Sequence, residues 1–154
     1  MQLGLTVRDA RRADWPRGVT LLRAAELPLA GIPDDLAGFI VAEEGGEVIG
    51  LAGLELYGPV GMVRSVVVRS DRRGVGCGEA LMHATLERAA RQRLETLVLL
   101  TTTAADWFER WGFGQTSWSE LPEEVRCSPL VQSGCPGSAV VMRRVLEREG
   151  TAFR

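Results

Sequence analysis

Lysine is absent from the sequence, so all eighteen side chains in the lysine-plus-arginine count are arginine. Without lysine the chain can contain neither a Walker-type nucleotide loop nor a lysine Schiff base. Histidine is scarce too, because His83 is the only one. A two-histidine metal motif is therefore excluded, and a Ser-His-Asp or Cys-His arrangement has a single possible imidazole. The neighbourhood of His83 has a helical pattern, which favours a solvated helix position, and we expect no metal site.

Cysteine is also rare, and the three residues Cys77, Cys127 and Cys135 show no Cys-x-x-Cys spacing. An odd number without that spacing is typical of free thiols in a reducing compartment, so we expect a cytoplasmic protein. Cys77 has two possible roles. A helix that begins beside it would lower the pKa of its thiol, or its side chain simply packs in the core.

Long apolar runs and a dominant charge are missing as well. No stretch approaches transmembrane length, and the N-terminus lacks the basic start and apolar run of a secretory signal, so we expect no membrane partner. Eighteen basic and twenty acidic side chains give a net charge of -2. No window collects enough arginine to neutralise a run of phosphates, so nucleic acid is not an expected partner. The 154 residues fit one domain.

The apolar pattern predicts six strands and three longer helices. A glycine turn at residues 44–47 predicts a hairpin, followed by a third antiparallel strand, and the strand from Thr96 is reached through a helix and should be parallel to its predecessor. We therefore expect an α/β protein of the α+β type, with a mixed, mostly antiparallel sheet of six to seven strands and helices on both faces. The predicted strands are Leu3–Val7, Phe39–Glu43, Val48–Tyr57, Met62–Arg69, Thr96–Leu100 and Ser138–Arg144.

The helical patterns lie between these strands. The first follows Asp14 as an N-cap, the second runs from the glycine-rich segment to about Arg93, and the third covers Ala104 to Trp111 before Gly112. Residues 27–35 are rich in proline and glycine, which predicts an irregular connection with a short helix from Asp34. Such a connection can shape a pocket.

A glycine-rich segment from Val66 to Glu79 leads from a strand into a helix. A diphosphate placed there would meet free backbone N–H groups and the positive end of the helix dipole, and Arg73 could add a charged donor. The plainer alternative is that the glycines only form a tight turn. A dinucleotide fold is excluded, because Glu79 stands where the third glycine of Gly-x-Gly-x-x-Gly would be.

The residues Arg73-x-x-Gly76-x-Gly78 resemble the acetyl-CoA signature of the GNAT superfamily of N-acetyltransferases, Gln/Arg-x-x-Gly-x-Gly/Ala. About thirty residues downstream, Trp107-Phe108-Glu-Arg-Trp-Gly112-Phe113 is similar to the family's Tyr/Phe-Glu-x-x-Gly-Phe segment. Both motifs occur in the family's order, and the predicted order of strands and helices agrees with the family too, so the resemblance covers essentially the whole chain.

A narrower resemblance is to the GNAT subgroup named for its association with arsenic-resistance operons. The name reflects genetic neighbourhood and not chemistry. Cys135 could then be a reactive thiol or an arsenic ligand. The residues that carry this resemblance are Leu27-Pro28, Gly53-Leu-Glu55-x-Tyr-Gly58, Arg64-Ser65, Leu99-Leu-Thr-Thr and Cys135-Pro-x-Ser138-Ala.

The resemblance implies an enzyme that binds acetyl-CoA and an amine together, so that the amine attacks the thioester directly. The backbone of Val66, Val67 and Val68 would pair with the pantetheine arm, with one amide facing the developing oxyanion. Backbone N–H groups of the next loop would hold the diphosphate, and Thr101 sits where relatives carry an asparagine that contacts CoA. The loop residues are Gly74, Val75, Gly76, Cys77, Gly78 and Glu79.

Two charged side chains within apolar strands are the candidate catalytic residues. Glu55 could be the general base, since partial burial would raise its pKa, or it could lie on the solvent side of its strand. Alternation would put Arg64 on the same strand face as Val66 and Val68, where it could bind a substrate carboxylate bidentately or pair with Glu55. A substrate carboxylate would indicate an amino acid or an analogue of one.

Phe108 is a departure from the family pattern, because many members have a tyrosine there that protonates the departing thiolate. Water, or the single tyrosine Tyr57, would have to replace it. Two hypotheses follow: an N-acetyltransferase acting on a small amine, or a GNAT-like sensor that binds acyl-CoA with little catalysis. A pure interaction protein with a fortuitous glycine turn is a third. Relatives are often dimers, so a homodimer is possible.

Overall fold

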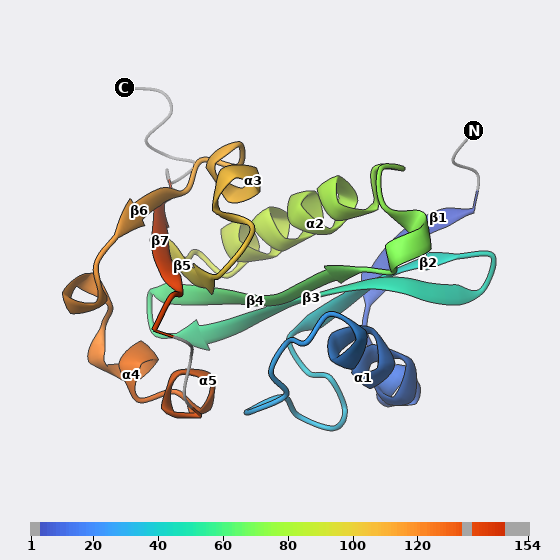
Figure 1. The fold of residues 1–154 in the computed structure, drawn as a ribbon, viewed down its shortest axis with the longest axis horizontal. Helices are drawn as coiled ribbons and strands as arrows, with labels where there is room; N and C mark the ends of the chain where they lie inside the picture. The colour runs from blue at the N-terminus through green and yellow to red at the C-terminus, as the bar shows by residue number, and fades with distance from the viewer. Residues whose placement is uncertain (1–3, 134–136, 147–154) are drawn as a thin grey trace.

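The computed structural model describes residues 4–133 and 137–146, which form one seven-stranded sheet in the order β1-β2-β3-β4-β5-β7-β6 (Figure 1). Neighbouring strands are antiparallel except for β4 and β5, which are parallel. This confirms the predicted mixed, mostly antiparallel sheet. The strands are β1 Leu5–Asp9, β2 Phe39–Glu44, β3 Glu47–Tyr57, β4 Val60–Val68, β5 Thr96–Thr101, β6 Gly114–Thr116 and β7 Val140–Val145.

Helices cover both faces of the sheet, as predicted. In Figure 1, α2 and α3 lie above the sheet, and α1, α4 and α5 lie below it. No helix of the described residues is long and apolar enough to cross a membrane. The α-helices are α1 Trp15–Ala24, α2 Cys77–Arg91, α3 Ala105–Glu109, α4 Glu123–Arg126 and α5 Pro129–Gln132, with 3-10 turns η1 Arg12–Asp14, η2 Ser70–Arg72 and η3 Trp118–Glu120.

The hairpin of β2 and β3 forms where the glycine turn predicted it. Gly45 and Gly46 both have positive φ, 59° and 83°, as a two-residue turn of type I′ requires. The following strand, β4, completes the meander, and residues 48–54 of β3 are buried. Side chains of β3 and β4 pack on α1 below the sheet and on α2 above it, which gives the core two layers.

Three local predictions differ from the structure. No helix begins at Asp34, because the segment forms turns in which Asp35 accepts the N–H of Ala37. Asp14 stands at the N-cap position of α1, but its side chain does not cap the helix. Its carboxylate instead accepts hydrogen bonds from the guanidinium of Arg8 and from the backbone N–H of Arg11. The short helices α4 and α5 lack a repeated apolar stripe, which explains why the pattern did not show them.

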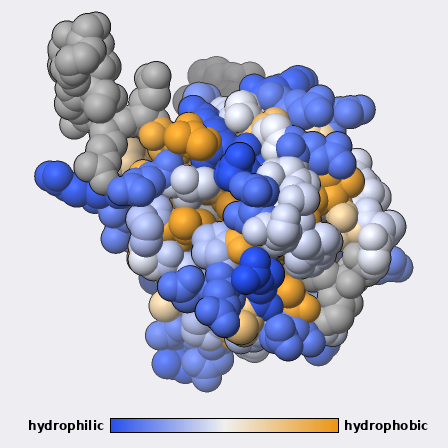
Figure 2. Space-filling model, turned by 90° about the vertical axis from the view of Figure 1, so that its left-hand side faces the viewer, coloured by the Kyte–Doolittle hydropathy of each residue, from blue (hydrophilic) through white to orange (hydrophobic). Residues whose placement is uncertain are grey.

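One end of the molecule carries β6, α4 and α5, and Figure 2 views it directly. Apolar residues appear there as separate spots between hydrophilic ones. Among the coloured residues this view therefore shows no broad apolar surface of the kind that obligate dimers bury. The possibility of a homodimer stays untested.

Candidate active site

The sheet opens between its two parallel strands. β4 and β5 pair only over Val60↔Thr96, Gly61↔Leu97 and Met62↔Val98. Beyond Met62 and Val98 the strands separate, and a cavity of about 240 Å³ lies in the gap. Its lining comes from both strands, from the β5–α3 loop, and from segments below the sheet: Glu26, Leu27, Pro28, Val63, Arg64, Ser65, Val66, Leu99, Leu100, Thr101, Thr102, Thr103, Ala104, Phe108, Leu130 and Ala139. We call it the strand-gap cavity.

A β-bulge at Ser65 reverses the alternation of β4. Arg64 pairs with Gly53 and Val67 with Leu51, so three steps on β4 face two on β3, and Ser65 takes a φ of +61°. Val66 and Val68 consequently pack on the α2 side, whereas Arg64 points to the opposite side of the sheet. The prediction that these three side chains share a face was wrong, because the extra residue shifts the period of two.

The peptide groups of Val66 and Val68 face the gap. Arg69 donates its N–H to Ile49 of β3, and Val67, two residues earlier, is also directed to β3. Alternation then turns the N–H and C=O groups of Val66 and Val68 toward the open side, where β5 no longer pairs with them. Two of the three predicted backbone positions can therefore pair with an extended ligand, and Val67 cannot.

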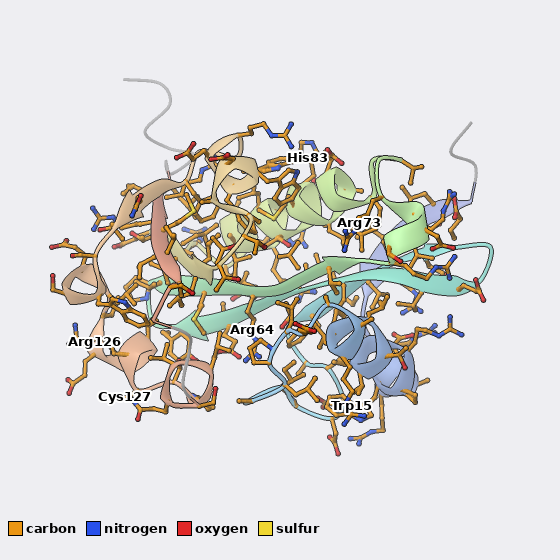
Figure 3. All side chains as sticks on the ribbon, in the orientation of Figure 1. Trp15, Arg64, Arg73, His83, Arg126 and Cys127 are labelled. Carbon is orange, nitrogen blue, oxygen red and sulfur yellow. The ribbon has the colours of Figure 1, made fainter. Side chains whose placement is uncertain are left out.

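The glycine loop ends at the N-terminus of α2. Gly74 and Gly76 have φ values of +83° and +89°, and a Cβ at either position would meet no atom within 4 Å. Their role is therefore conformational, and they leave open space beside the first-turn amides of α2, which have no intrahelical acceptor. Arg73 is exposed and forms no ion pair within the described residues. Figure 3 shows it above the sheet, on the opposite side from Arg64.

Gly78 has a different reason to be glycine. A Cβ there would lie 3.3 Å from Cζ2 of Trp107, because the indole packs over the first turn of α2. Trp107 also contacts Phe108 and Trp111 with ring centroids 5.0 and 5.9 Å apart. His83 is exposed, as expected of a solvated helix position, and its ring meets Trp111 edge-on. The two sequence motifs are thus in direct contact through Trp107 and Gly78.

Cys77 is a packing residue. Its side chain is 1% exposed, and a Cβ on Gly50 would lie 2.9 Å from its Sγ, so the start of α2 sits directly on β3. Burial, reinforced by the carboxylates of Glu44 and Glu79, raises the pKa of the Cys77 thiol to about 11. The expected lowering by the helix N-terminus was wrong, because desolvation of the thiolate outweighs the helix dipole here.

We expect this difference in environment to separate the cysteines chemically. At pH 8 a thiol with a pKa near 11 is thiolate in only about one molecule in a thousand. Iodoacetamide should therefore label the exposed Cys127 in the folded protein and leave Cys77 unmodified, whereas both should be labelled in urea. Peptide mass mapping would show this, and equal labelling rates for the two cysteines in the folded protein would contradict it. Cys135 lies outside the described residues.

Glu55 and Arg64 form an ion pair in which Nη1 of Arg64 lies 2.9 Å from Oε2 of Glu55. The Arg64 side chain is 2% exposed and that of Glu55 17% exposed. Tyr57 donates its hydroxyl to Oε1 of Glu55 at 2.6 Å. Burial, and then this hydrogen bond to the carboxylate, raises the pKa of Tyr57 to about 12, so its hydroxyl stays protonated at neutral pH.

Arg64 uses most of its donors within the protein. Nε donates to the Ser65 hydroxyl, Nη1 to the Ala30 carbonyl as well as to Glu55, and Nη2 to the Pro28 carbonyl. Four of its five N–H groups are thereby engaged, which leaves one on Nη2. A bidentate clamp on a substrate carboxylate needs two, so the structure supports the ion-pair alternative and at most a single hydrogen bond to a ligand.

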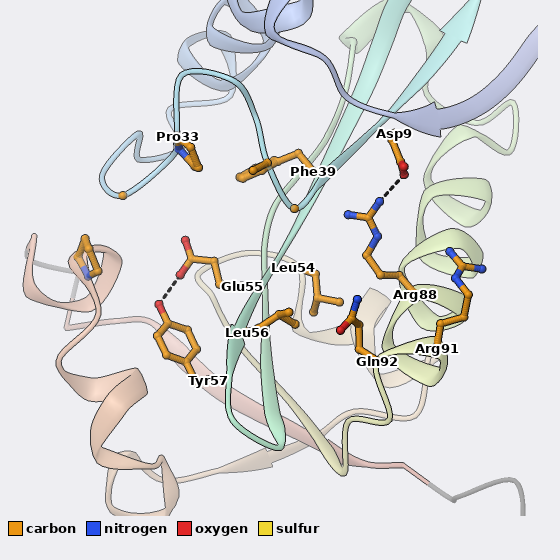
Figure 4. Close-up of a pocket in the computed structure, with 14 residues that line it drawn as sticks. Asp9, Pro33, Phe39, Leu54, Glu55, Leu56, Tyr57, Arg88, Arg91 and Gln92 are labelled. Atoms are coloured by element: carbon orange, nitrogen blue, oxygen red, sulfur yellow. Dashed lines mark hydrogen bonds and ion pairs between the residues drawn. The ribbon is translucent and has the colours of Figure 1, made fainter.

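Glu55 is not among the residues that line the strand-gap cavity. It lines a separate cavity of about 660 Å³ at the edge of β3, together with Tyr57, Arg88 and Arg91 (Figure 4). Arg64 lines the strand-gap cavity and stands between it and Glu55. The sequence left the ion pair of Glu55 with Arg64 open as one of two alternatives, and the structure shows both the ion pair and the cavity that each residue lines.

Phe108 and Thr101 both line the strand-gap cavity. Phe108 is 7% exposed and packs on Phe113, so the aromatic residue in the place of the family's tyrosine serves the core. The Thr101 hydroxyl accepts the N–H of Ala104 at 3.0 Å, which leaves its own O–H free to donate to a ligand. Sequence reasoning did not identify Ser65, Glu26, Leu130 or Ala139 as lining residues. The positive φ of Ser65 has no sequence signal, and the other three lie far along the chain from the glycine-rich segment.

Comparison with known proteins identifies a family. The family described as "Acetyltransferase (GNAT) domain" matches residues 35–115. Amino-acid acetyltransferase of Ralstonia nicotianae is 36% identical over 94 residues, which are 60% of this chain and 21% of that protein. Amino-acid acetyltransferase of Neisseria meningitidis is 25% identical over 150 residues, 92% of this chain and 34% of that protein. The chain thus spans about a fifth to a third of these relatives.

Solved structures share the fold. N-acetylglutamate synthase of Neisseria gonorrhoeae, complexed with coenzyme A and N-acetyl-glutamate, superposes with a TM-score of 0.82 at 24% identity, over 94% of this chain and 35% of that one. Rv2747 of Mycobacterium tuberculosis, in complex with CoA and NLQ, gives a TM-score of 0.77 at 23% identity, over 92% and 99% of the two chains.

Proposed function

The chain belongs to the GNAT acetyltransferase family, and we propose that it transfers an acetyl group from acetyl-CoA to the amine of a small molecule, an amino acid or an analogue of one. The observation that carries the proposal is the strand-gap cavity, which joins the glycine loop side of the sheet to the segments below it. A donor and an acceptor can meet there from opposite faces. The names of the relatives in the comparisons support an amino-acid acceptor.

Acetyl-CoA fits the residues on the upper side. Its diphosphate would lie against the free amides at the start of α2, beside the open space at Gly74 and Gly76. The peptide groups of Val66 and Val68 would pair with the pantetheine arm as an added strand does. The thioester that acetyl-CoA supplies would then reach the gap beside the bulge at Ser65, where peptide N–H groups of β4 not paired with β5 can face a developing oxyanion.

We propose that Glu55 and Arg64 act as a unit on the acceptor side. Glu55 holds the guanidinium of Arg64, and Arg64 holds the loop at Pro28 and Ala30 and keeps one N–H for the acceptor. Since Glu55 does not line the strand-gap cavity, we assign it a positioning role and assign the removal of the amine proton to water. The thiol of CoA has a pKa near that of ordinary thiols, about 8 to 9. The thiolate can therefore leave without a general acid at the position that Phe108 occupies.

The acyl-CoA sensor is the second candidate, and the buried ring of Phe108 is the observation that favours it. Tyr57 does not replace the missing hydroxyl, because it binds Glu55 and lines the other cavity. A sensor would bind acetyl-CoA as tightly as an enzyme would and release CoA only at the rate of uncatalysed hydrolysis.

We expect acetyl-CoA to raise the melting temperature of the protein. A ligand at about 100 times its Kd adds roughly 2.7 kcal/mol to the free energy of unfolding. The release of free CoA with each amino acid would then be measured with a thiol reagent. Stabilisation with CoA release establishes the enzyme, and stabilisation without it establishes the sensor. No shift at millimolar acetyl-CoA would reject both.

Three narrower expectations remain part of this proposal. Membership of the arsenic-resistance subgroup, on residues such as Glu55, Tyr57 and Arg64, is one of them, and its name carries no information on the acceptor. The odd number of cysteines and the lack of a Cys-x-x-Cys spacing support a cytoplasmic location. Sedimentation of the protein with and without acetyl-CoA would decide between monomer and homodimer.

A further inference from the structure

The acceptor side of the strand-gap cavity carries two charged side chains among its described lining residues, Glu26 and Arg64. Arg64 is committed to the protein through four of its five N–H groups. No ion pair or side-chain hydrogen bond within the described residues engages the carboxylate of Glu26. The cavity therefore presents an uncommitted carboxylate and a single cationic N–H group.

Glu26 stands in an unusual backbone conformation. α1 ends in a Schellman motif, in which Leu27 donates its N–H to the Leu22 carbonyl and Glu26 donates to the Arg23 carbonyl. The residue between helix and loop in this motif has positive φ, and glycine is the usual choice. Here Glu26 takes a φ of +58°. The same motif ends α2 with Arg93 at φ +58°, so the motif itself does not require a glutamate. Glu26 is exposed and lines the strand-gap cavity, where its carboxylate is accessible to a ligand.

Resting on the proposed function, we propose that Glu26 binds the ammonium group of the acceptor before transfer, while the remaining N–H of Arg64 donates a hydrogen bond to one carboxylate oxygen of the acceptor. The site then selects compounds that carry both charges, which is the case for amino acids. An amine that has no carboxylate would lack the contact with Arg64. The acetylated product has no ammonium group, so it would lose the contact with Glu26 and dissociate. The Glu26 carboxylate would therefore both bind the substrate and favour release of the product.

The test compares Glu26→Gln, Glu26→Gly and Glu26→Asp with the unaltered protein, using the standard amino acid that releases CoA fastest. We expect the KM for that amino acid to rise roughly fivefold to tenfold in the Gln and Gly variants, since an ammonium–carboxylate contact is lost. The Asp variant should recover part of it. The kcat should stay within about twofold, and the Kd for acetyl-CoA should not change.

Glu26→Gly separates binding from folding. Because glycine suits positive φ, its melting temperature should rise by roughly 2 to 4 °C while its KM worsens. Glu123→Gln, an exposed carboxylate of α4 that does not line the cavity, is the matched control and should leave the KM unchanged. An unchanged KM in both Glu26→Gln and Glu26→Gly would overturn the assignment. If the unaltered protein releases no CoA with any amine, the proposed function fails first, and this inference fails with it.

Discussion

Replacing Gly76 with aspartate should weaken acetyl-CoA binding by roughly 100-fold, the largest effect on binding that we expect from one substitution. A Cβ at this position meets no protein atom within 4 Å, so the new carboxylate would occupy the space beside the first-turn amides of α2. The new carboxylate would accept hydrogen bonds from those amides, and its negative charge would repel the diphosphate. Loss of a charged hydrogen bond costs about 1.5–3 kcal/mol, and about 2.7 kcal/mol corresponds to the 100-fold change.

Two controls separate charge from backbone strain. Gly76→Asn has almost the same shape and tolerates positive φ, so its Kd should rise much less than that of the aspartate variant. Gly58→Asp introduces the same residue at another positive-φ glycine, φ +61°, where a Cβ likewise meets nothing within 4 Å. It should lose stability and keep its affinity. Isothermal titration with acetyl-CoA measures all three, and equal affinities of the Asp and Asn variants at Gly76 would remove the diphosphate from this loop.

Replacing Arg64 with alanine should lower the free energy of unfolding by about 3 kcal/mol, the largest stability effect that we expect. Breaking a buried pair leaves one charge without its partner, which typically costs 3–5 kcal/mol. The lower end applies because Glu55 keeps 17% of its side chain exposed. The carbonyl groups of Pro28 and Ala30 lose their donor as well. Arg64→Lys should not restore stability, since an ammonium group cannot reach four partners held by a planar guanidinium.

A double-mutant cycle with Glu55→Gln tests whether the two residues act as a unit. Urea unfolding of both single variants and of the double variant should give a coupling free energy above about 1 kcal/mol. Under our proposal that Glu55 positions Arg64, and since Glu55 does not line the strand-gap cavity, Glu55→Gln should lower kcat less than tenfold and keep the shape of the pH profile. A fall of 100-fold or more, with loss of the acidic limb of that profile, would instead make Glu55 the general base.

Local signals were sufficient for most of the elements. The glycine pair before Glu47 predicted the hairpin, and the periodicity change after Gly78 predicted α2, because both depend on contacts within a few residues. The sequence pattern did not predict the short helices α4 and α5, since a four-residue helix is too short to show a helical period. The β-bulge at Ser65 was not predicted either. A serine with positive φ has no sequence signature, and its conformation depends on pairing with Gly53 and Leu51 of β3.

The sequence alone determined the family and the strand-to-helix turn of the glycine-rich loop, because Arg73, Gly76 and Gly78 lie close together in the chain and their conformational demands are local. It also offered the ion pair of Glu55 with Arg64 as one of two alternatives. Only the tertiary structure decided which cavity each side chain faces, that Cys77 is buried on Gly50, and that Glu26 shares a cavity with Arg64. These facts depend on the bulge and on packing between distant segments, which no local pattern contains.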